Sequence, residues 1–309
     1  MSAPVQLGLV GFGKIARDQH VPAIAKTDGI DLVAVASPHS QAPGLRNYHS
    51  LEELLAGEPA LDAIVLCQPP QVRFEAARTA LLAGKHVFLE KPPGATVSEV
   101  VALTELANRQ GVTLFASWHS RYGSAVPAAK AWVAARTATS VAIAWREDVR
   151  VWHPGQDWIW QAGGFGVFDP GINALSILTE VIAEPVRLIS AELETPTNRQ
   201  APIAARLAMA TASGVPIAAD FDFLQTGEQT WDIVVEAGGE RLCLGHGGNR
   251  LSLGGVAQDV GAEAEYPTMY RHFVDLIRAR RSDVDVAPLQ LVADAFLRGQ
   301  SSPTEPFID

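Results

Sequence analysis

The stretch Val5-Gln6-Leu7-Gly8-Leu9-Val10-Gly11-Phe12-Gly13-Lys14-Ile15-Ala16 decides the fold of the amino-terminal part of the chain. It begins with an apolar run of strand length and ends by opening a segment of helical spacing, Ile15–Lys26, in which Pro22 is an anomaly. The G-x-G-x-x-A pattern between the two is typical of a dinucleotide-binding turn. We expect Gly11 to allow a tight turn and Gly13 to let the backbone approach a pyrophosphate, while Ala16 permits close packing of helix on strand.

Alternating strand and helix patterns continue to about residue 120. Four further runs are apolar throughout, as parallel strands buried on both faces require: Asp31–Ala36, Ala63–Cys67, His86–Leu89 and Thr113–Ala116. Segments with helical spacing lie between them: Ser50–Ala56, Val72–Ala83 and Val97–Gln110. This alternation predicts an α/β fold, a doubly wound Rossmann domain that binds NAD(P), over residues 1–120.

The pattern changes over residues 121–309. Six strand-like runs are separated by short turns, which predicts a mainly antiparallel sheet: Val186–Leu193, Ile203–Thr211, Pro216–Phe223, Thr230–Glu236, Arg241–Leu244 and Arg250–Leu253. Helices are expected at Ser124–Ala135, from about Asp169, and near Pro267–Arg280 and Pro288–Leu297. We interpret this part as an α+β substrate-binding domain whose carboxyl-terminal helix packs back on the first domain.

Composition excludes several classes of function. The 309 residues include 24 Lys and Arg against 34 Asp and Glu, and this net charge of −10 argues against a nucleic-acid surface. No apolar run approaches the roughly 18 residues of a membrane span, and no signal peptide is visible, so we expect no membrane partner. Cys67 and Cys243 are expected to be buried free thiols of a cytoplasmic protein. No histidine pair has H-x-x-x-H spacing, which disfavours a metal hydrolase, and no metal is expected.

The end of the second predicted strand bears on the cofactor. An NAD-selective site places Asp or Glu about 20 residues after the glycines to bind the ribose 2′-hydroxyl. This chain has Ser37-Pro38-His39-Ser40 there, without a carboxylate. Ser37 and His39 could donate hydrogen bonds to a 2′-phosphate, so we expect NADP to be used at least as well as NAD. The turn also lacks arginine, so the preference for the phosphate is expected to be modest.

Two further motifs carry chemistry. Glu90-Lys91-Pro92-Pro93 follows the fourth predicted strand, at the sheet edge where ligands bind, and the Lys91 ammonium could stabilise an alkoxide there. Taken alone, this motif favours the simpler interpretation that Lys91 is a surface lysine in a proline turn. The second motif, Gly163–Asn173, ends in Asp169-Pro170-Gly171-Ile172-Asn173. Asp169 is expected to be a helix N-cap before Pro170, with Asn173 one turn further on the same face, and a cap alone would also explain it.

The glycine loop, Glu90-Lys91-Pro92 and the Gly-Gly-x-Gly-x-x-Asp-x-Gly cluster, in this order, resemble the glucose–fructose oxidoreductase/inositol dehydrogenase/rhizopine catabolism (Gfo/Idh/MocA) family over essentially the whole chain. Three segments are similar to a narrower group of bacterial L-arabinose and D-galactose 1-dehydrogenases: Gly11–His20, Trp118–Arg121 and Trp152–Gln156. The resemblance implies a Rossmann domain plus an open sheet domain, with the site between them.

The resemblance also implies the site residues. Lys91 and Asp169 would act at the reacting carbon, and the sugar would contact Lys91, His119, Glu147, Trp152, His153, Asp169 and Asn173. The cofactor would contact Gly11, Gly13, Lys14, Ile15, Ser37, His39, Gln68, Pro69, Glu90 and Lys91. Many relatives carry histidine as the general base where this chain has Asn173, which cannot accept a proton at neutral pH. Asp169 and Lys91 are then the matched candidates for the proton acceptor. His153 and His119 are less favoured, because each could equally be a packed or sugar-binding imidazole.

Tryptophans next to polar residues fit a sugar, because pyranose C–H faces lie on indole rings while hydroxyls need polar partners. Trp152, beside His153, is the better candidate for ring contact, and we expect Trp145, Trp158 and Trp160 to be core or wall residues and Trp231 to be core or interface.

These observations favour an NAD(P)-dependent aldose 1-dehydrogenase that oxidises L-arabinose, D-galactose or D-fucose at C1 to the aldonolactone. Two alternatives remain: a dehydrogenase of another hydroxyl, of the inositol type, and a dinucleotide-binding regulator without catalysis. Glu147, His153 and Asn173 argue against the first, and the presence of Lys91 and Asp169 argues against the second. A homodimer through the carboxyl-terminal sheet is expected by analogy with the family alone.

Overall fold

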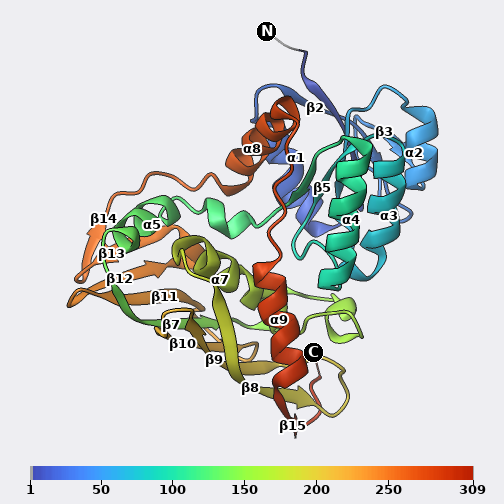
Figure 1. Ribbon diagram of the computed structural model, residues 1–309. Coiled ribbons are helices and arrows are strands. Elements are labelled where there is room, and N and C mark those ends of the chain that lie inside the picture. Colours follow the sequence, from blue (N-terminus) through green and yellow to red (C-terminus); the bar gives the residue numbers. More distant parts are fainter. Residues whose placement is uncertain (1–2, 309) are drawn as a thin grey trace. The chain divides into compact units, whose positions relative to one another are not determined.

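The computed structural model describes residues 3–308, which divide into two compact units (Figure 1). The first unit runs to His119 and also includes Tyr266–Val286. The second comprises Ser120–Glu265 and the residues from Ala287 onward. Each unit has its own sheet, and each is described here by itself.

The first unit is built on a six-stranded sheet in the order β3-β2-β1-β4-β5-β6. Every neighbouring pair is parallel. The strands are β1 (Val5–Val10), β2 (Ile30–Ala36), β3 (Arg46–Tyr48), β4 (Ala63–Leu66), β5 (His86–Leu89) and β6 (Leu114–Ala116). This order, with the chain crossing over after β3 to the other side of β1, is that of a doubly wound dinucleotide-binding fold, so the predicted Rossmann domain is confirmed.

Helices cover both faces of this sheet, as the uninterrupted apolar runs predicted. Val87 and Leu89 of β5 pack in the core cluster that also contains residues of α2 (Leu51–Gly57), α3 (Pro70–Leu82) and α4 (Val97–Gln110), which lie side by side in Figure 1. Phe88 faces the opposite way, where its ring stacks on Tyr270 of α8 (Glu265–Ala279) at 5.1 Å. Successive residues of β5 point to opposite faces of the sheet. Helices from distant parts of the chain therefore pack on both faces of this strand.

The segment after the glycine loop differs from the single helix that its spacing predicted. A π-helix (Ala16–His20) comes first, and α1 (Val21–Ala25) follows it. The Val21 amide donates to the Ala16 carbonyl, five residues back, and Pro22 lies in the first turn of α1, where its missing N–H costs nothing. The anomaly at Pro22 therefore marks a helix restart, and the wider π-turn buries His20 completely.

The second unit contains a nine-stranded sheet in the order β14-β13-β12-β11-β7-β10-β9-β8-β15. Two pairs, β7 with β10 and β8 with β15, are parallel, and the others are antiparallel, so the predicted mainly antiparallel sheet is confirmed. The strands are β7 (Ala138–Arg146), β8 (Val186–Pro196), β9 (Ala204–Thr211), β10 (Pro216–Asp222), β11 (Thr230–Ala237), β12 (Glu240–Gly245), β13 (Arg250–Leu253), β14 (Val256–Gln258) and β15 (Gln300–Thr304).

One face of this sheet is covered by α5 (Val126–Ala134), α7 (Phe168–Val181) and α9 (Ala287–Arg298) (Figure 1). Val141, Ile143 and Trp145 of β7 are buried, whereas Ala142 between them is exposed. Of the two closing helices, α8 belongs to the first unit and α9 packs on β8 and α7 in the second. Among the described residues, no helix combines the length and apolar character that crossing a membrane requires.

Candidate active site

A cavity of about 610 Å³ opens over the glycine loop at the carboxyl ends of β1, β2 and β4. Of the residues predicted to bind the cofactor, six line it: Gly11, Gly13, Ser37, His39, Gln68 and Pro69. Lys14, Ile15, Glu90 and Lys91 do not line it; Lys14 is exposed and pairs with Asp18 one turn on. The cavity is therefore lined by those predicted cofactor-binding residues that lie in the glycine loop and at the two neighbouring strand ends.

Glycine is required at the two loop positions, Gly11 and Gly13, for different physical reasons. Gly11 adopts φ +91°, and a Cβ there would lie 2.9 Å from the Gln68 amide nitrogen, so both conformation and space require glycine. A Cβ on Gly13 would meet no described atom within 4 Å. Packing within the chain therefore does not explain Gly13, whereas a pyrophosphate approaching the backbone does. In addition, the buried Gln68 Oε1 has no hydrogen-bond partner among the described residues and is available to a ligand. These features fit a dinucleotide.

The charged side chains around the cavity bear on whether the 2′-phosphate of NADP would be bound there. No lysine or arginine is among the residues that line it; His39 and His49 are the lining side chains that can carry positive charge, while Glu52 and Glu75 line it as well. The turn Ser37–Ser40 itself carries no carboxylate.

Cys67 also lines the cavity, and burial raises the pKa of its thiol well above the usual value. Both cysteines are free, as expected, but each is half-buried rather than fully buried.

Glu90, which precedes Lys91, lies in a buried polar cluster that the sequence did not reveal. His20 Nε2 is 3.2 Å from Glu90 Oε1, and the Tyr266 hydroxyl donates to the same oxygen at 2.9 Å. His20 Nδ1 lies 2.6 Å from the Tyr270 hydroxyl. Burial alone would raise the pKa of Glu90, but the hydrogen bond and charge of His20, with the charges of His119 and Lys91, lower it to about 2. Glu90 is therefore a carboxylate at neutral pH.

Backbone contacts hold the half-buried Lys91 and its loop. The Lys91 amide donates to Glu90 Oε2, and the Lys91–Pro92 bond is cis. The buried Arg73 guanidinium donates to the carbonyl oxygens of Glu90, Pro92 and Gln68. The carboxylate of Glu90 and the guanidinium of Arg73 thus fix the main chain on both sides of Lys91. His119, at the end of this unit, is half-buried and stacks on Tyr266 with ring centroids 5.4 Å apart.

The second unit brings three predicted residues into one cluster. His153 Nε2 is 2.9 Å from Glu147 Oε1, and His153 Nδ1 is 3.6 Å from Asp169 Oδ2. Glu147 follows β7, His153 ends the short helix α6 (Val149–Trp152), and Asp169 lies in the first turn of α7. Both carboxylates are 97% buried. Buried charges of this kind need partners, and each carboxylate here lies against the same imidazole.

The expectation that Asp169 is a helix N-cap is wrong. The helix α7 begins at Phe168 with Val167 as its N-cap, so Asp169 is its second residue and Pro170 its third. The Phe168 amide donates a hydrogen bond to the Phe165 carbonyl, and the Asp169 amide donates one to the Gly166 carbonyl. The helix therefore starts earlier than the Asp-Pro pair suggested. Gly166 has φ +52°, and a Cβ there would lie 2.3 Å from the Pro202 carbonyl oxygen. The Asp169 carboxylate lies near His153 from this position in the first turn of α7.

Two tryptophans stand beside this cluster. Trp152, the predicted sugar contact, is 40% exposed, and its ring lies edge-on to Trp231 at 5.0 Å. The Trp231 indole N–H donates to Glu147 Oε2 at 2.9 Å, so this residue, expected in a core or interface, belongs to the site. Trp145 and Trp160 are buried as expected, and Trp158 is half-buried. No sequence pattern indicates this role of Trp231, because its link to Glu147 arises from the pairing of β11 with β7.

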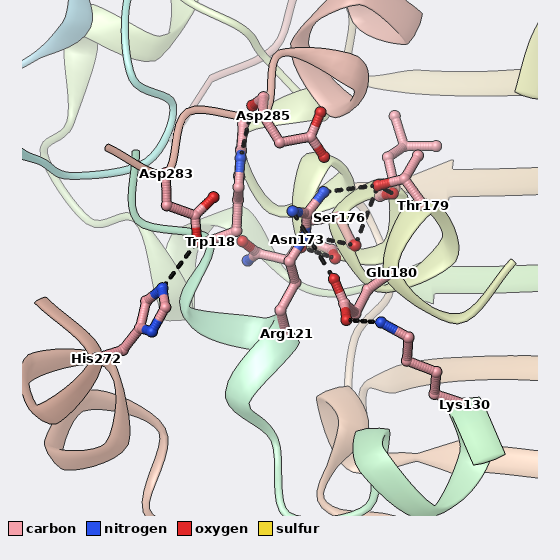
Figure 2. A network of polar contacts seen from close by, with 11 residues as sticks. Trp118, Arg121, Lys130, Asn173, Ser176, Thr179, Glu180, His272, Asp283 and Asp285 are labelled. Atoms are coloured by element: carbon pink, nitrogen blue, oxygen red, sulfur yellow. Dashed lines mark hydrogen bonds and ion pairs between the residues drawn. The ribbon is translucent and has the colours of Figure 1, made fainter. Parts of the chain in front are cut away.

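Arg121 anchors the helix that carries Asp169 and Asn173 (Figure 2). Its guanidinium donates to the Ser176 carbonyl at 3.0 Å and to the Thr179 hydroxyl at 2.9 Å, and it lies 4.0 Å from Glu180. The Ser176 hydroxyl donates to the Asn173 carbonyl at 2.7 Å. Asn173 is half-buried, one turn after Asp169 as predicted. Arg121 was only part of a motif in the sequence, and the structure gives it this supporting role.

Comparisons with known proteins agree with this arrangement. Residues 5–117 match the family described as "Oxidoreductase family, NAD-binding Rossmann fold". Galactose 1-dehydrogenase from Pseudomonas fluorescens is 48% identical over 306 residues, which cover 99% of both chains. The crystal structure of a D-galactose-1-dehydrogenase protein from Rhizobium etli superposes with a TM-score of 0.96 and 56% identity, covering 100% of this chain and 99% of that one.

A more distant structure shares the fold alone. A 3-ketoreductase from Actinomadura kijaniata, solved with NADP, covers 97% of this chain and 99% of its own with a TM-score of 0.85 but only 17% identity. The full-length identity to the galactose 1-dehydrogenase from Pseudomonas fluorescens decides the assignment. The chain belongs to the Gfo/Idh/MocA family of NAD(P)-binding oxidoreductases.

Proposed function

We propose that this protein is an NAD(P)-dependent galactose 1-dehydrogenase that oxidises the anomeric carbon of D-galactose, and also of L-arabinose and D-fucose, to the aldonolactone. The observation that carries the proposal is the identity of 48% over 99% of both chains with a galactose 1-dehydrogenase. The buried pair Glu147 and Asp169 around His153, beside the exposed Trp152, supports it, because a pyranose needs both fixed polar partners and an indole face.

We assign the chemical steps to individual residues. A dinucleotide held at the glycine loop and Gln68 would supply the hydride acceptor for C1 of the sugar. Asp169 accepts the proton of the C1 hydroxyl, and the Lys91 ammonium holds the same oxygen and stabilises its developing negative charge. Glu147, His153, Asn173 and His119 bind sugar hydroxyls, and Trp152 contacts the apolar face of the ring. Lys91 as the proton acceptor is the alternative, and the variants discussed below separate the two.

The cofactor proposal is that NADP serves at least as well as NAD. The turn Ser37–Ser40 has no carboxylate to repel a 2′-phosphate, and His39 and Ser37 line the cavity with hydrogen-bond donors. The presence of Glu52 and Glu75 and the absence of lysine and arginine from the lining keep the preference modest. We further propose a cytoplasmic protein, which the two free cysteines support.

We also propose a homodimer through the outer face of the nine-stranded sheet. The helices α5, α7 and α9 lie on one face, and the exposed side chains of the other include the small Ala142 and Ala218. Small side chains allow two sheets to approach closely. Sedimentation equilibrium of the whole protein tests this proposal, and a monomer at micromolar concentration would contradict it.

Initial rates with a panel of aldoses and both cofactors test the function. D-galactose, L-arabinose and D-fucose differ only in the substituent at C5, so all three should be oxidised. D-glucose should be poor, because its epimeric C4 hydroxyl leaves polar groups of the site unpaired. Highest kcat/KM with D-glucose, or faster turnover of myo-inositol than of any aldose, would contradict the proposal.

A further inference from the structure

His20 is fully buried in the first unit, and each of its ring nitrogens has a polar partner. Nε2 lies 3.2 Å from Glu90 Oε1, and Nδ1 lies 2.6 Å from the Tyr270 hydroxyl. Three rings, those of Phe88, Tyr266 and Tyr270, meet the imidazole at steep angles of 74° to 84°, with centroids 5.0 to 5.8 Å away. Polar contacts at both nitrogens and aromatic contacts around the ring hold the imidazole in one orientation.

The partners of His20 determine which of its nitrogens carries a hydrogen. A carboxylate only accepts hydrogen bonds, so Nε2, which faces the ionised Glu90, carries one. The Tyr270 hydroxyl can donate to Nδ1 or accept from it, so this contact fits a neutral and a charged imidazole equally. The hydrogen bond that His20 donates to Glu90 is therefore made in either charge state of the ring.

Glu90 uses its two carboxylate oxygens for different partners. Oε1 accepts from His20 and from the Tyr266 hydroxyl, whereas Oε2 accepts from the main-chain amide of Lys91. The two oxygens move together, because a carboxylate group is planar and rigid. A turn of the Glu90 side chain away from His20 would thus also displace the acceptor of the Lys91 amide. Holding Oε1 therefore fixes the main chain from which the Lys91 side chain starts.

The helix after the glycine loop is shaped to bring His20 to this place. The Val21 amide donates to the Ala16 carbonyl, five residues back, so the turn that ends in His20 is wider than in an α-helix. The wider turn changes the direction in which the His20 side chain leaves the helix, and such turns are frequent at functional sites. The aromatic rings around His20 would also pack on an apolar side chain, so packing alone does not explain a donor directed at Glu90.

We propose, on the basis of the proposed function, that His20 is a positioning residue for Lys91. Its Nε2–H holds one oxygen of Glu90, and the other oxygen of Glu90 holds the main-chain amide of Lys91. The Lys91 ammonium is thereby kept where it stabilises the negative charge that develops on the reacting oxygen. Tyr270 fixes the imidazole at its other nitrogen. Because His20 is fully buried, it acts through Glu90 and not on the sugar itself.

The variants His20→Gln and His20→Asn test this role as a matched pair. Both replace the ring by an amide and lose the same aromatic packing, but the glutamine amide reaches as far as Nε2, whereas the asparagine amide reaches only as far as Nδ1. With D-galactose, His20→Asn should therefore lower kcat by about 10- to 100-fold with little change of KM, and His20→Gln should keep kcat within about 3-fold of wild type. An equal loss of kcat in both variants, or an effect confined to KM, would overturn the proposal.

Binding of the reduced cofactor supplies a readout that does not need turnover. In fluorescence titrations with NADPH, or with NADH if the wild type uses that cofactor, His20→Asn and the wild type should have the same Kd, because His20 acts on Lys91 and not on the glycine loop. Much weaker binding of the reduced cofactor by His20→Asn would assign His20 to the glycine loop and overturn its role toward Lys91.

Two further variants complete the test. If His20→Asn does not fold, Tyr270→Phe decides, because it removes only the hydroxyl that fixes Nδ1: a several-fold lower kcat at unchanged KM supports the proposal, and wild-type kcat overturns it. The control is His272→Asn, which breaks another histidine–carboxylate pair of the first unit, with Asp283 at 2.8 Å (Figure 2), and should retain kcat. Failure of the wild-type protein to oxidise any aldose would contradict the proposed function. Aldose oxidation with wild-type kcat in His20→Asn would contradict the positioning role alone.

Discussion

Glu90 and His20 form a buried pair in the first unit, with His20 Nε2 3.2 Å from Glu90 Oε1 and the two side chains 4% and 0% exposed, respectively. The pair joins the π-helix that follows the glycine loop to the strand end that precedes Lys91. Tyr266 and Tyr270 of α8 complete it. Segments that are far apart in the sequence are thus fixed next to Lys91, the residue that we assign to the reacting oxygen.

The first prediction concerns stability against pH. The pKa of Glu90 is lowered from 4.5 to about 2 in the folded protein, so between these values the unfolded chain binds one more proton than the native one. The stability that Glu90 contributes is complete above pH 4.5 and is lost as pH falls toward 2. Glu90→Gln should lower the free energy of unfolding at pH 7, and its difference from wild type should shrink by about 1.4 kcal/mol per pH unit below 4.5.

Urea denaturation at several pH values between 7 and 3 measures this difference. Glu105→Gln is the matched control, because Glu105 lies on an exposed helix surface near Arg109 and should show a small difference at every pH. A difference between Glu90→Gln and wild type that stayed constant from pH 5 to pH 3 would contradict the assignment of an ionised, buried Glu90.

The second prediction separates the two candidates for the proton acceptor. Asp169→Asn keeps shape and hydrogen bonding but loses basicity, so kcat should fall by about 10²–10⁴-fold with a much smaller rise in KM. Lys91→Ala removes the charge that stabilises the alkoxide and should also act mainly on kcat. Asp275→Asn on the exposed side of α8 is the control. Near wild-type kcat in Asp169→Asn, together with inactive Lys91→Ala, would identify Lys91 as the base.

The third prediction assigns Asn173 to binding. Asn173→Ala removes one neutral hydrogen-bonding group from the half-buried position one turn after Asp169, so KM should rise by roughly 2- to 10-fold, which corresponds to about 0.5–1.5 kcal/mol, while kcat changes little. Asn108→Ala, at an exposed position in the last turn of α4, controls for the loss of an asparagine from a helix and should leave both constants unchanged. A large loss of kcat in Asn173→Ala would instead give this residue a part in proton transfer.

The sequence predicted the elements whose residues repeat with a simple period. Five strands of the Rossmann sheet were predicted because their runs are almost entirely apolar. The helix predicted over Val97–Gln110 has the bounds of α4, whose amino-terminal end is fixed by a capping box of Thr96 and Glu99. The strand β7 was not predicted, although Val141, Ile143 and Trp145 alternate, because Trp145 also begins the tryptophan-rich stretch that fits a sugar site. The short edge strands β3 and β15 are polar and carry no such signal.

The site was predictable only where a motif carried it. Asp169, His153 and Glu147 came from a resemblance, and the structure explains their grouping by strand and helix ends that meet in the second unit. Trp231 reaches Glu147 from a strand 84 residues further along the chain, and Tyr266 reaches Glu90 over 176 residues. Contacts of that kind depend on the sheet register and on where α8 returns, and a single sequence holds no local pattern for either.

The fourth prediction concerns the choice of cofactor. Measured at saturating D-galactose, kcat/KM for NADP should equal or exceed that for NAD, since the turn Ser37–Ser40 at the cavity has no carboxylate. Ser37→Asp places a carboxylate at the end of β2, where it repels the 2′-phosphate and accepts a hydrogen bond from the ribose 2′-hydroxyl, so the ratio should shift toward NAD. Ser98→Asp, on exposed α4, adds the same charge away from the cavity and should leave the ratio unchanged. A strong preference of the wild type for NAD would refute the cofactor proposal, because Glu52 or Glu75 would then outweigh the histidines of the cavity.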